Sequence, residues 1–239
     1  MCARPKESQA DRLTAAQIAI DNSLSDDEIQ ARVAEYGYPV AKLTAGKTLY
    51  TAALNAVGNA ESAAGAQKLA TDHVESAEQI ARDAFQALAK VCRAAFSDEP
   101  AQLTALQLDG KTPRSTAAFL TTANILFQNA LGTPEIQTTL AEYGYTAQKL
   151  QTECAKITSF SQANESQEAA KGAAQQATVV QNNALAELDD WMARYIKIAQ
   201  VALRDEPQLL EKLGILSRSS KTAAQLAQRR KKTTTSPTK

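Results

Sequence analysis

The sequence has few of the residues from which most enzyme and metal sites are built. Its 239 residues include one histidine, His73, and three cysteines, Cys2, Cys92 and Cys154. Helical di-iron sites need a Glu-x-x-His motif on each of two helices, and zinc sites and Cys-His nucleophiles need more histidine or better-spaced cysteine. The cysteines show no CxxC spacing, which is typical of incidental thiols in a reducing compartment. We therefore predict no catalytic residues, no cofactor, no metal and no enzymatic activity, and we expect His73 to be solvated.

The chain also lacks long apolar runs and is poor in aromatic residues. No run of about 18 apolar residues is present, which argues against a transmembrane segment. The polar start, Met1 to Lys6, has no apolar segment of the kind found in secretory signals, so we expect a cytoplasmic protein. Aromatic residues make up only 5% of the sequence, whereas alanine, the best helix former, is abundant. This composition favours a close-packed all-α protein over a β-sandwich.

Two segments resemble the end of a phosphate-binding P-loop. Ala45–Thr48 and Asp109–Thr112 both contain Gly-Lys-Thr, but the glycine that opens the motif is replaced by Ala41 and Ala105. A P-loop also follows a strand, and no strand is predicted here. Because the phosphate cradle depends on glycine amides, we exclude both segments as phosphate sites.

The most informative feature that the sequence does contain is an internal duplication. Ala34–Tyr38 and Ala141–Tyr145 both read Ala-Glu-Tyr-Gly-Tyr. The two copies of this motif are 107 positions apart. When the sequence is aligned with itself at this displacement, about a third of roughly 100 aligned positions are identical, and no gap is needed. We therefore divide the chain into a flexible N-terminal arm (1–8), repeat 1 (9–108), a linker (109–115), repeat 2 (116–216) and a basic tail (217–239) that we expect to be disordered.

Each repeat is predicted to contain two short helices, a long helical arm and a short closing helix. Ser25 and Thr133 are predicted to cap the second short helix of their repeats. Gly37 and Gly144 are predicted to end it, because glycine enters the left-handed conformation without strain. The tyrosines around these glycines are then expected to pack the joints between helices. The alternative is that they line a ligand pocket. These residues are Tyr36, Tyr38, Tyr143 and Tyr145.

The long arms permit two interpretations. Residues 40–96 and 147–203 contain no proline, and one helix of this length would span about 85 Å. Segments poor in large apolar residues, each followed by a capping pattern, favour helical hairpins that turn near 64–71 and 171–178. The alternative is one kinked helix per repeat. Hairpins would give an antiparallel four-helix-bundle-like core with accessory helices, and the apolar spacing is also typical of coiled coils. Trp191, which replaces Ala84 of repeat 1, is predicted to pack in the core or between the repeats, and the alternative is a stacking platform.

The charge is distributed unevenly, although the formal net charge is zero. Residues 217–239 carry seven cations and no acid, which leaves a formal −7 on residues 1–216. The basic tail can contact an acidic surface through charge alone. No aromatic residue follows Tyr195, so we expect no specific nucleic-acid binding. The candidate electrostatic contacts are Arg229, Arg230, Lys231 and Lys232.

The twin Ala-Glu-Tyr-Gly-Tyr motif, the Leu-Asp-Asp-Trp-Met run at 188–192 and the Pro-Gln-Leu-Leu-Glu-Lys-Leu-Gly run at 207–214 resemble a family of uncharacterised bacterial proteins. The resemblance covers roughly residues 10–216. It implies an all-helical, internally duplicated protein, and it implies no activity or site residue, because the family has no assigned activity.

From these observations we expect a structural or interaction protein that forms a homo-oligomer or binds another protein. The alternative is a small-molecule-binding helical bundle with a pocket between the two repeats.

Overall fold

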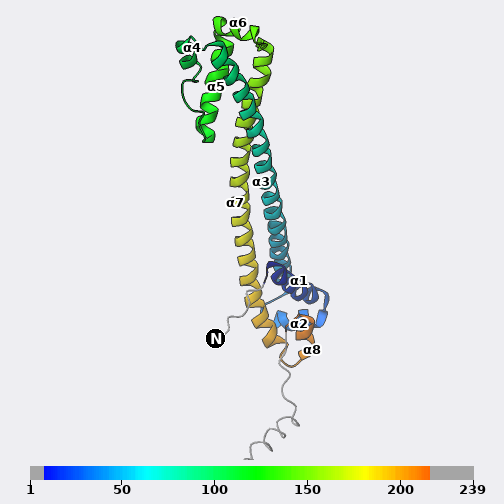
Figure 1. Cartoon of the computed structure of the whole chain (residues 1–239). Helices are drawn as coiled ribbons and strands as arrows, with labels where there is room; N and C mark the ends of the chain where they lie inside the picture. The colour runs from blue at the N-terminus through cyan, green and yellow to red at the C-terminus, as the bar shows by residue number, and fades with distance from the viewer. Residues whose placement is uncertain (1–7, 216–239) are drawn as a thin grey trace, which may run out of the picture. The chain divides into compact units, whose positions relative to one another are not determined.

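The computed structural model describes residues 8–215, and every regular element in this range is a helix. The all-α prediction is therefore confirmed for the described residues. No helix within this range is both long and apolar enough to cross a bilayer. In chain order the helices are α1 (Gln9–Ser25), α2 (Asp27–Glu35), α3 (Val40–Ala95), α4 (Pro100–Ala105), α5 (Thr116–Gly132), α6 (Pro134–Glu142), α7 (Ala147–Ala202) and α8 (Pro207–Lys212) (Figure 1).

The last four helices repeat the order and the lengths of the first four. α1 and α5 have 17 residues each, and α2 and α6 have nine. α3 and α7 have 56 residues each, and α4 and α8 have six. The first residues of each pair, for example Gln9 and Thr116, are 107 positions apart. This is also the displacement at which the two sequence repeats align.

The predicted glycine stops lie at the ends of α2 and α6. Gly37 and Gly144 have φ angles of +82° and +78°, in the left-handed region. After α2, the Gly37 amide donates to the Ala34 carbonyl and the Tyr38 amide donates to the Val33 carbonyl, both at 3.0 Å. The same pair of bonds follows α6. This is the Schellman arrangement, which satisfies carbonyls that the helix end would otherwise leave unpaired.

The predicted hairpin turns are wrong. α3 continues through residues 64–71, and α7 continues through residues 171–178. The hydroxyl of Thr71, the last residue of the predicted turn at 64–71, donates to the Gln67 carbonyl one helical turn earlier, at 3.0 Å. Such a bond satisfies the hydroxyl inside a continuous helix. Gly65 and Gly172 each cost only about 1 kcal/mol relative to alanine in a helix interior, and the alanine-rich surroundings tolerate this cost.

The described residues form two compact units whose boundaries lie within α3 and α7. Unit 1 comprises residues 8–60 and 177–215, and unit 2 comprises Glu61–Gln176. Each unit therefore combines part of one predicted repeat with part of the other. The four-helix core that we expected from two separate hairpins is not confirmed.

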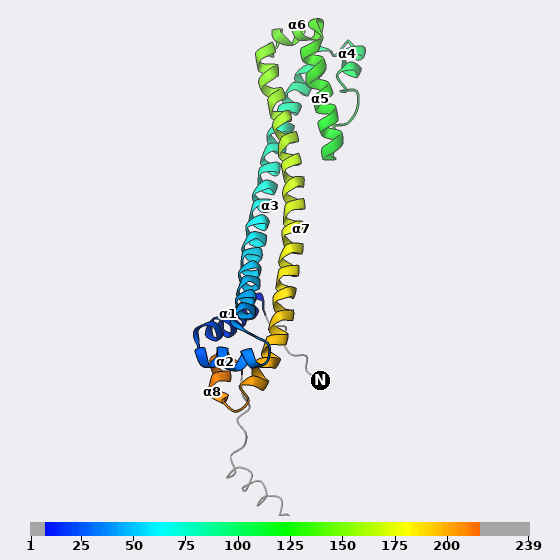
Figure 2. The ribbon, with the colours of Figure 1, turned by 180° about the vertical axis from the view of Figure 1, so that it is seen from behind.

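Unit 1 packs α1, α2, the first part of α3, the last part of α7 and α8 around one core. In both views α1, α2 and α8 gather around the parts of α3 and α7 that belong to this unit (Figures 1 and 2). Arg12 of α1 pairs with Asp189 of α7, and Lys212 of α8 pairs with Asp26 at the start of α2 at 3.0 Å. Large core residues of this unit are Ile20, Ile29, Leu43, Leu188, Trp191, Tyr195 and Leu213.

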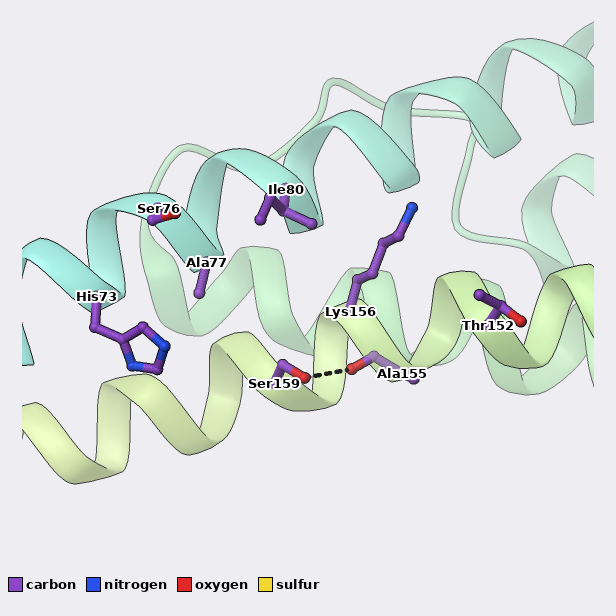
Figure 3. A pocket seen from close by; sticks show the side chains of 8 residues that line it. All are labelled: His73, Ser76, Ala77, Ile80, Thr152, Ala155, Lys156 and Ser159. Atoms are coloured by element: carbon purple, nitrogen blue, oxygen red, sulfur yellow. Dashed lines mark hydrogen bonds between the residues drawn. The ribbon is translucent and has the colours of Figure 1, made fainter.

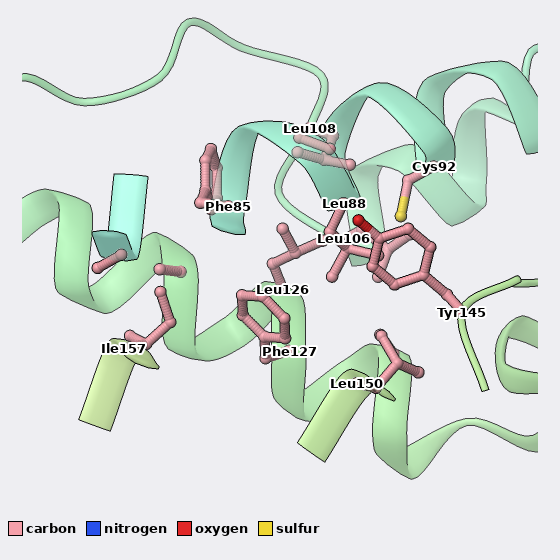
Figure 4. Packing of buried hydrophobic residues seen from close by; sticks show 14 of the residues in the cluster. Phe85, Leu88, Cys92, Leu106, Leu108, Leu126, Phe127, Tyr145, Leu150 and Ile157 are labelled. Carbon is pink, nitrogen blue, oxygen red and sulfur yellow. The ribbon is translucent and has the colours of Figure 1, made fainter. Parts of the chain in front are cut away.

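Unit 2 packs the last part of α3, α4, α5, α6 and the first part of α7 around a second core (Figure 4). Phe85 of α3 meets Phe119 of α5 edge to face, with ring centroids 5.4 Å apart. The guanidinium of Arg82 lies 4.3 Å from the centroid of the Phe119 ring. Other large core residues of this unit are Leu88, Leu106, Leu126, Phe127, Ile136, Leu150, Ile157 and Phe160.

Candidate functional site

Two adjoining pockets open between α3 and α7 in unit 2. Both have volumes in the range typical of small-molecule sites, and they share Ile80 and Lys156. The His73 pocket has a volume of about 340 Å³ and is lined by His73, Ser76, Ala77, Ile80, Thr152, Ala155, Lys156 and Ser159 (Figure 3). The Tyr145 pocket has a volume of about 370 Å³ and is lined by Ile80, Asp83, Ala84, Ala87, Tyr145, Glu153 and Lys156.

Helical spacing brings the side chains of the His73 pocket together. The lining residues of α3 and those of α7 recur at steps of three and four, so each set occupies one face of its helix. In Figure 3 the His73 ring extends from α3 toward α7, and the Lys156 side chain extends from α7 toward α3. The Ser159 hydroxyl donates to the Ala155 carbonyl at 3.0 Å. Among the residues that line this pocket, His73 and Lys156 are the ones with ionisable side chains.

The Tyr145 pocket carries more charge. Lys156 Nζ donates to Glu153 Oε2 at 2.7 Å, and Gln79 Nε2 donates to Asp83 Oδ1 at 2.9 Å. Burial, together with the nearby Glu153 carboxylate, raises the pKa of Tyr145 above its ordinary value. Two carboxylates therefore face one ammonium around this pocket.

The equivalent part of unit 1 is filled by aromatic rings. The Trp191 ring stacks on Tyr195 with centroids 5.0 Å apart and meets Tyr38 edge to face at 5.9 Å. Tyr195 and Ser23 share a buried hydrogen bond, and burial raises the pKa of the Tyr195 phenol. The buried Trp191 Nε1 has no hydrogen-bond partner within residues 8–215. Ring packing rather than hydrogen bonding therefore holds the indole.

The four predicted tyrosines fall into two kinds of environment. Tyr36 and Tyr143 are exposed, whereas Tyr38 and Tyr145 are buried. Tyr38 belongs to the core of unit 1 and Tyr145 to that of unit 2. Trp191 is buried in unit 1. The predicted electrostatic contacts, Arg229, Arg230, Lys231 and Lys232, lie outside the described residues, as do Cys2 and the basic tail.

The remaining reactive side chains do not form a metal or thiol site among the described residues. No group of three or more His, Cys, Asp or Glu residues within 8–215 could hold a metal ion. Burial raises the pKa of the Cys92 thiol to about 12 and also raises that of Cys154. His73 is exposed at the edge of its pocket.

Sequence reasoning missed the charged lining of the Tyr145 pocket, namely Asp83, Glu153 and Lys156. A signal was available in the alignment of the repeats, where Ala84 is aligned with Trp191 and Glu153 with Gly46. Each change of this size indicates a difference in packing, but only the structure shows that the two positions are neighbours.

The resemblance to a bacterial family remains a prediction, because no family model, no curated protein and no solved structure matches the chain.

Proposed function

We propose that this chain is a non-enzymatic structural or interaction protein that self-associates through one face of α3. The exposure of two apolar residues of α3 is the observation that carries the proposal. The exposed fraction of the accessible surface is 71% for Leu69 and 49% for Ile80. They are separated by eleven residues, about three helical turns, and so lie on one side of α3. Single exposed apolar residues are common; what favours an interaction surface here is that two of them lie on the same side of α3 and that one of them, Ile80, also lines both pockets.

A second copy of the chain fits this surface. In a two-fold symmetric contact, α3 of one copy would pack antiparallel against α3 of the other. Leu69 of each copy would then lie beside Ile80 of the other, so the apolar pair is self-complementary.

We also propose that the chain arose by tandem duplication of one helical unit. The four pairs of helices with equal lengths, each 107 residues apart, support this origin. If so, α3 and α7 diverged after the copy was made: Gln176 and Glu187 of α7 correspond to Leu69 and Ile80 of α3.

Size-exclusion chromatography with light scattering tests self-association. We expect the intact protein to be a dimer and the variant Leu69→Gln/Ile80→Glu, which carries the residues of α7, to be a monomer. The matched control is Leu54→Ser, another exposed apolar residue of α3 replaced by its counterpart Ser161, and it should remain a dimer. Removal of residues 217–239 should not change the mass of the assembly beyond that of the tail. A monomeric intact protein would overturn the proposal.

Small-molecule binding is the second candidate function, and the Tyr145 pocket favours it. The pocket is lined by Ile80, Asp83, Ala84 and Ala87 from repeat 1 and by Tyr145, Glu153 and Lys156 from repeat 2. A screen of small aromatic and polar compounds by protein-observed NMR tests it. Chemical-shift changes confined to the neighbourhood of this pocket are expected, and a screen without such changes would remove this candidate.

A further inference from the structure

The Tyr145 pocket of unit 2 lies at the position that an indole ring fills in unit 1. In unit 1, Trp191 packs against Tyr38, Tyr195 and Gly46. A Cβ atom at Gly46 would overlap the Trp191 ring, so glycine is required for this packing. The indole and the missing side chain at position 46 therefore depend on each other.

Unit 2 has the opposite arrangement, with a small residue in place of the tryptophan and a larger one in place of the glycine. The residues 107 positions away from Trp191, Tyr38 and Gly46 are Ala84, Tyr145 and Glu153. All three line the Tyr145 pocket. A methyl group replaces the indole, and the Glu153 side chain, only 17% exposed, turns to Lys156. The space next to Tyr145 is left as a pocket of about 370 Å³.

The lining defines which ligand would suit this pocket. Ala84, Ala87 and the Tyr145 ring provide apolar walls of the kind that pack against a flat aromatic ring. Asp83 and Glu153 provide two carboxylates against the single ammonium of Lys156. A positively charged group gains from this balance, because it can pair with either carboxylate.

We infer that the Tyr145 pocket binds a small planar aromatic compound that carries a cationic amino group. The inference rests on the second candidate function and adds the ligand class to it. The aromatic ring occupies the position equivalent to that of the Trp191 indole. The amino group lies beside Asp83 and Glu153.

Isothermal titration calorimetry with the full-length chain tests the inference. The probes are tryptamine, indole and indole-3-acetate, which share one ring and differ in charge. Tryptamine should bind most tightly, indole more weakly and indole-3-acetate most weakly. Glu153→Gln and Asp83→Asn should each weaken tryptamine binding about 3- to 10-fold and leave indole binding unchanged. The matched control is Asp190→Asn, the unit 1 counterpart of Asp83, which should change neither affinity.

A variant that copies unit 1 tests the location of the site. Ala84→Trp/Glu153→Gly should fill the pocket with an indole and abolish tryptamine binding. Ala84→Trp alone should lower thermal stability, because the Glu153 Cβ would meet the new ring as a Cβ at Gly46 would meet Trp191. If the double variant does not fold, as judged by circular dichroism, the Glu153→Gln and Asp83→Asn titrations decide.

The outcomes test the ligand class, the inferred site and the second candidate function separately. Tighter binding of indole-3-acetate than of tryptamine would overturn the ligand class and leave the second candidate function standing. Binding of none of the three probes, or tryptamine binding that is unchanged in the folded double variant, would overturn the inferred site. A compound screen without shifts at this pocket would remove the second candidate function as well.

Discussion

At the scale of single residues, Gln107 adopts a backbone conformation that suits glycine. Its φ angle is +57°, and its counterpart in the other repeat is Gly214, with φ +71°. Each of these residues follows a six-residue helix. After each helix, two backbone hydrogen bonds close the turn in the same pattern. The second repeat thus has the residue that the turn favours, and the first repeat does not.

Gln107→Gly is therefore expected to stabilise the protein. A left-handed conformation costs a non-glycine residue about 1–2 kcal/mol, and glycine in turn loses more chain entropy on folding. The net expectation is a gain of about 0.5–1 kcal/mol in the free energy of unfolding, measured by urea denaturation. Gln107 is exposed, so no packing is lost. The reverse change, Gly214→Gln, should be destabilising, and a loss of stability in Gln107→Gly would contradict this account.

Buried acidic groups of single residues also predict how stability depends on pH. Burial raises the pKa of Cys92 from 9.0 to about 12 and raises that of Tyr195. The folded state then holds these protons more tightly than the unfolded state. The stabilisation is complete below the unfolded pKa of each group and is lost as the pH rises toward the folded value. We expect the free energy of unfolding to fall between about pH 9 and about pH 12.

The variant Cys92→Ala isolates the thiol contribution. Alanine occupies the equivalent, fully buried position 199, so the fold should accept it. The intact protein should lose more stability than the variant between about pH 9 and about pH 12 in urea titrations. Equal losses would show that the Cys92 thiol does not contribute.

At the scale of elements, the sequence predicts short helices better than long ones. Gly37 and Gly144 end their helices as predicted because the φ requirement is local. Thr133 occupies the cap position of α6 as predicted, but its side chain accepts no capping hydrogen bond. The other predicted cap, Ser25, is the last residue of α1, and Asp26 caps α2 instead. Adjacent serine and aspartate residues are both good caps, so local pattern leaves this choice open.

The continuity of α3 and α7 could not be predicted from the same local signals. A threonine before an acidic residue can begin a helix, or its hydroxyl can bond the preceding turn of a continuous one. Thr71 does the latter, and its hydroxyl also accepts from Gln167 Nε2 of α7 at 3.1 Å. That contact joins residues 96 positions apart. Tertiary packing of this kind decides between a turn and a helix and is not visible in a local window.

Gly65→Ala and Gly172→Ala test the continuity of these helices. A Cβ at either position meets nothing within 4 Å, and alanine is favoured over glycine by about 0.8–1.0 kcal/mol in a helix interior. Each variant should raise the free energy of unfolding by nearly this amount in urea denaturation. If the chain instead turned at these glycines with a positive φ, alanine would be destabilising. The sign of the change therefore distinguishes the two arrangements.

At the scale of the whole molecule, the two units have different interiors. Arg12 pairs with Asp189 in unit 1. The equivalent positions in unit 2 are Phe119 and Arg82, where the guanidinium lies over the ring. The alignment predicted such exchanges, of which Trp191 for Ala84 is the largest. It could not predict that residues 8–60 pack with residues 177–215, because such pairing depends on contacts between distant segments.

The composition of the units leads to a prediction for a divided chain. Each unit contains segments from both sides of the linker at 109–115, so neither repeat carries a complete core. Fragments 1–109 and 110–239, expressed separately, should each expose apolar core residues such as Leu88 or Trp191. A fragment that cannot bury its core loses the main source of folding free energy.

Mixing the two fragments should restore the fold. We expect a complex that contains equal amounts of the two fragments and has, by light scattering, the mass of the dimer proposed for the intact chain. Its circular dichroism should show the helix content of the intact chain, and it should unfold cooperatively in urea. Separate fragments should show less helix and should bind a hydrophobic dye. A fragment that unfolds cooperatively as a monomer would contradict the division into units, because it would require a core built within a single repeat. The double variant Leu69→Gln/Ile80→Glu should re-form the complex equally well, since both side chains are exposed and lie outside the buried core.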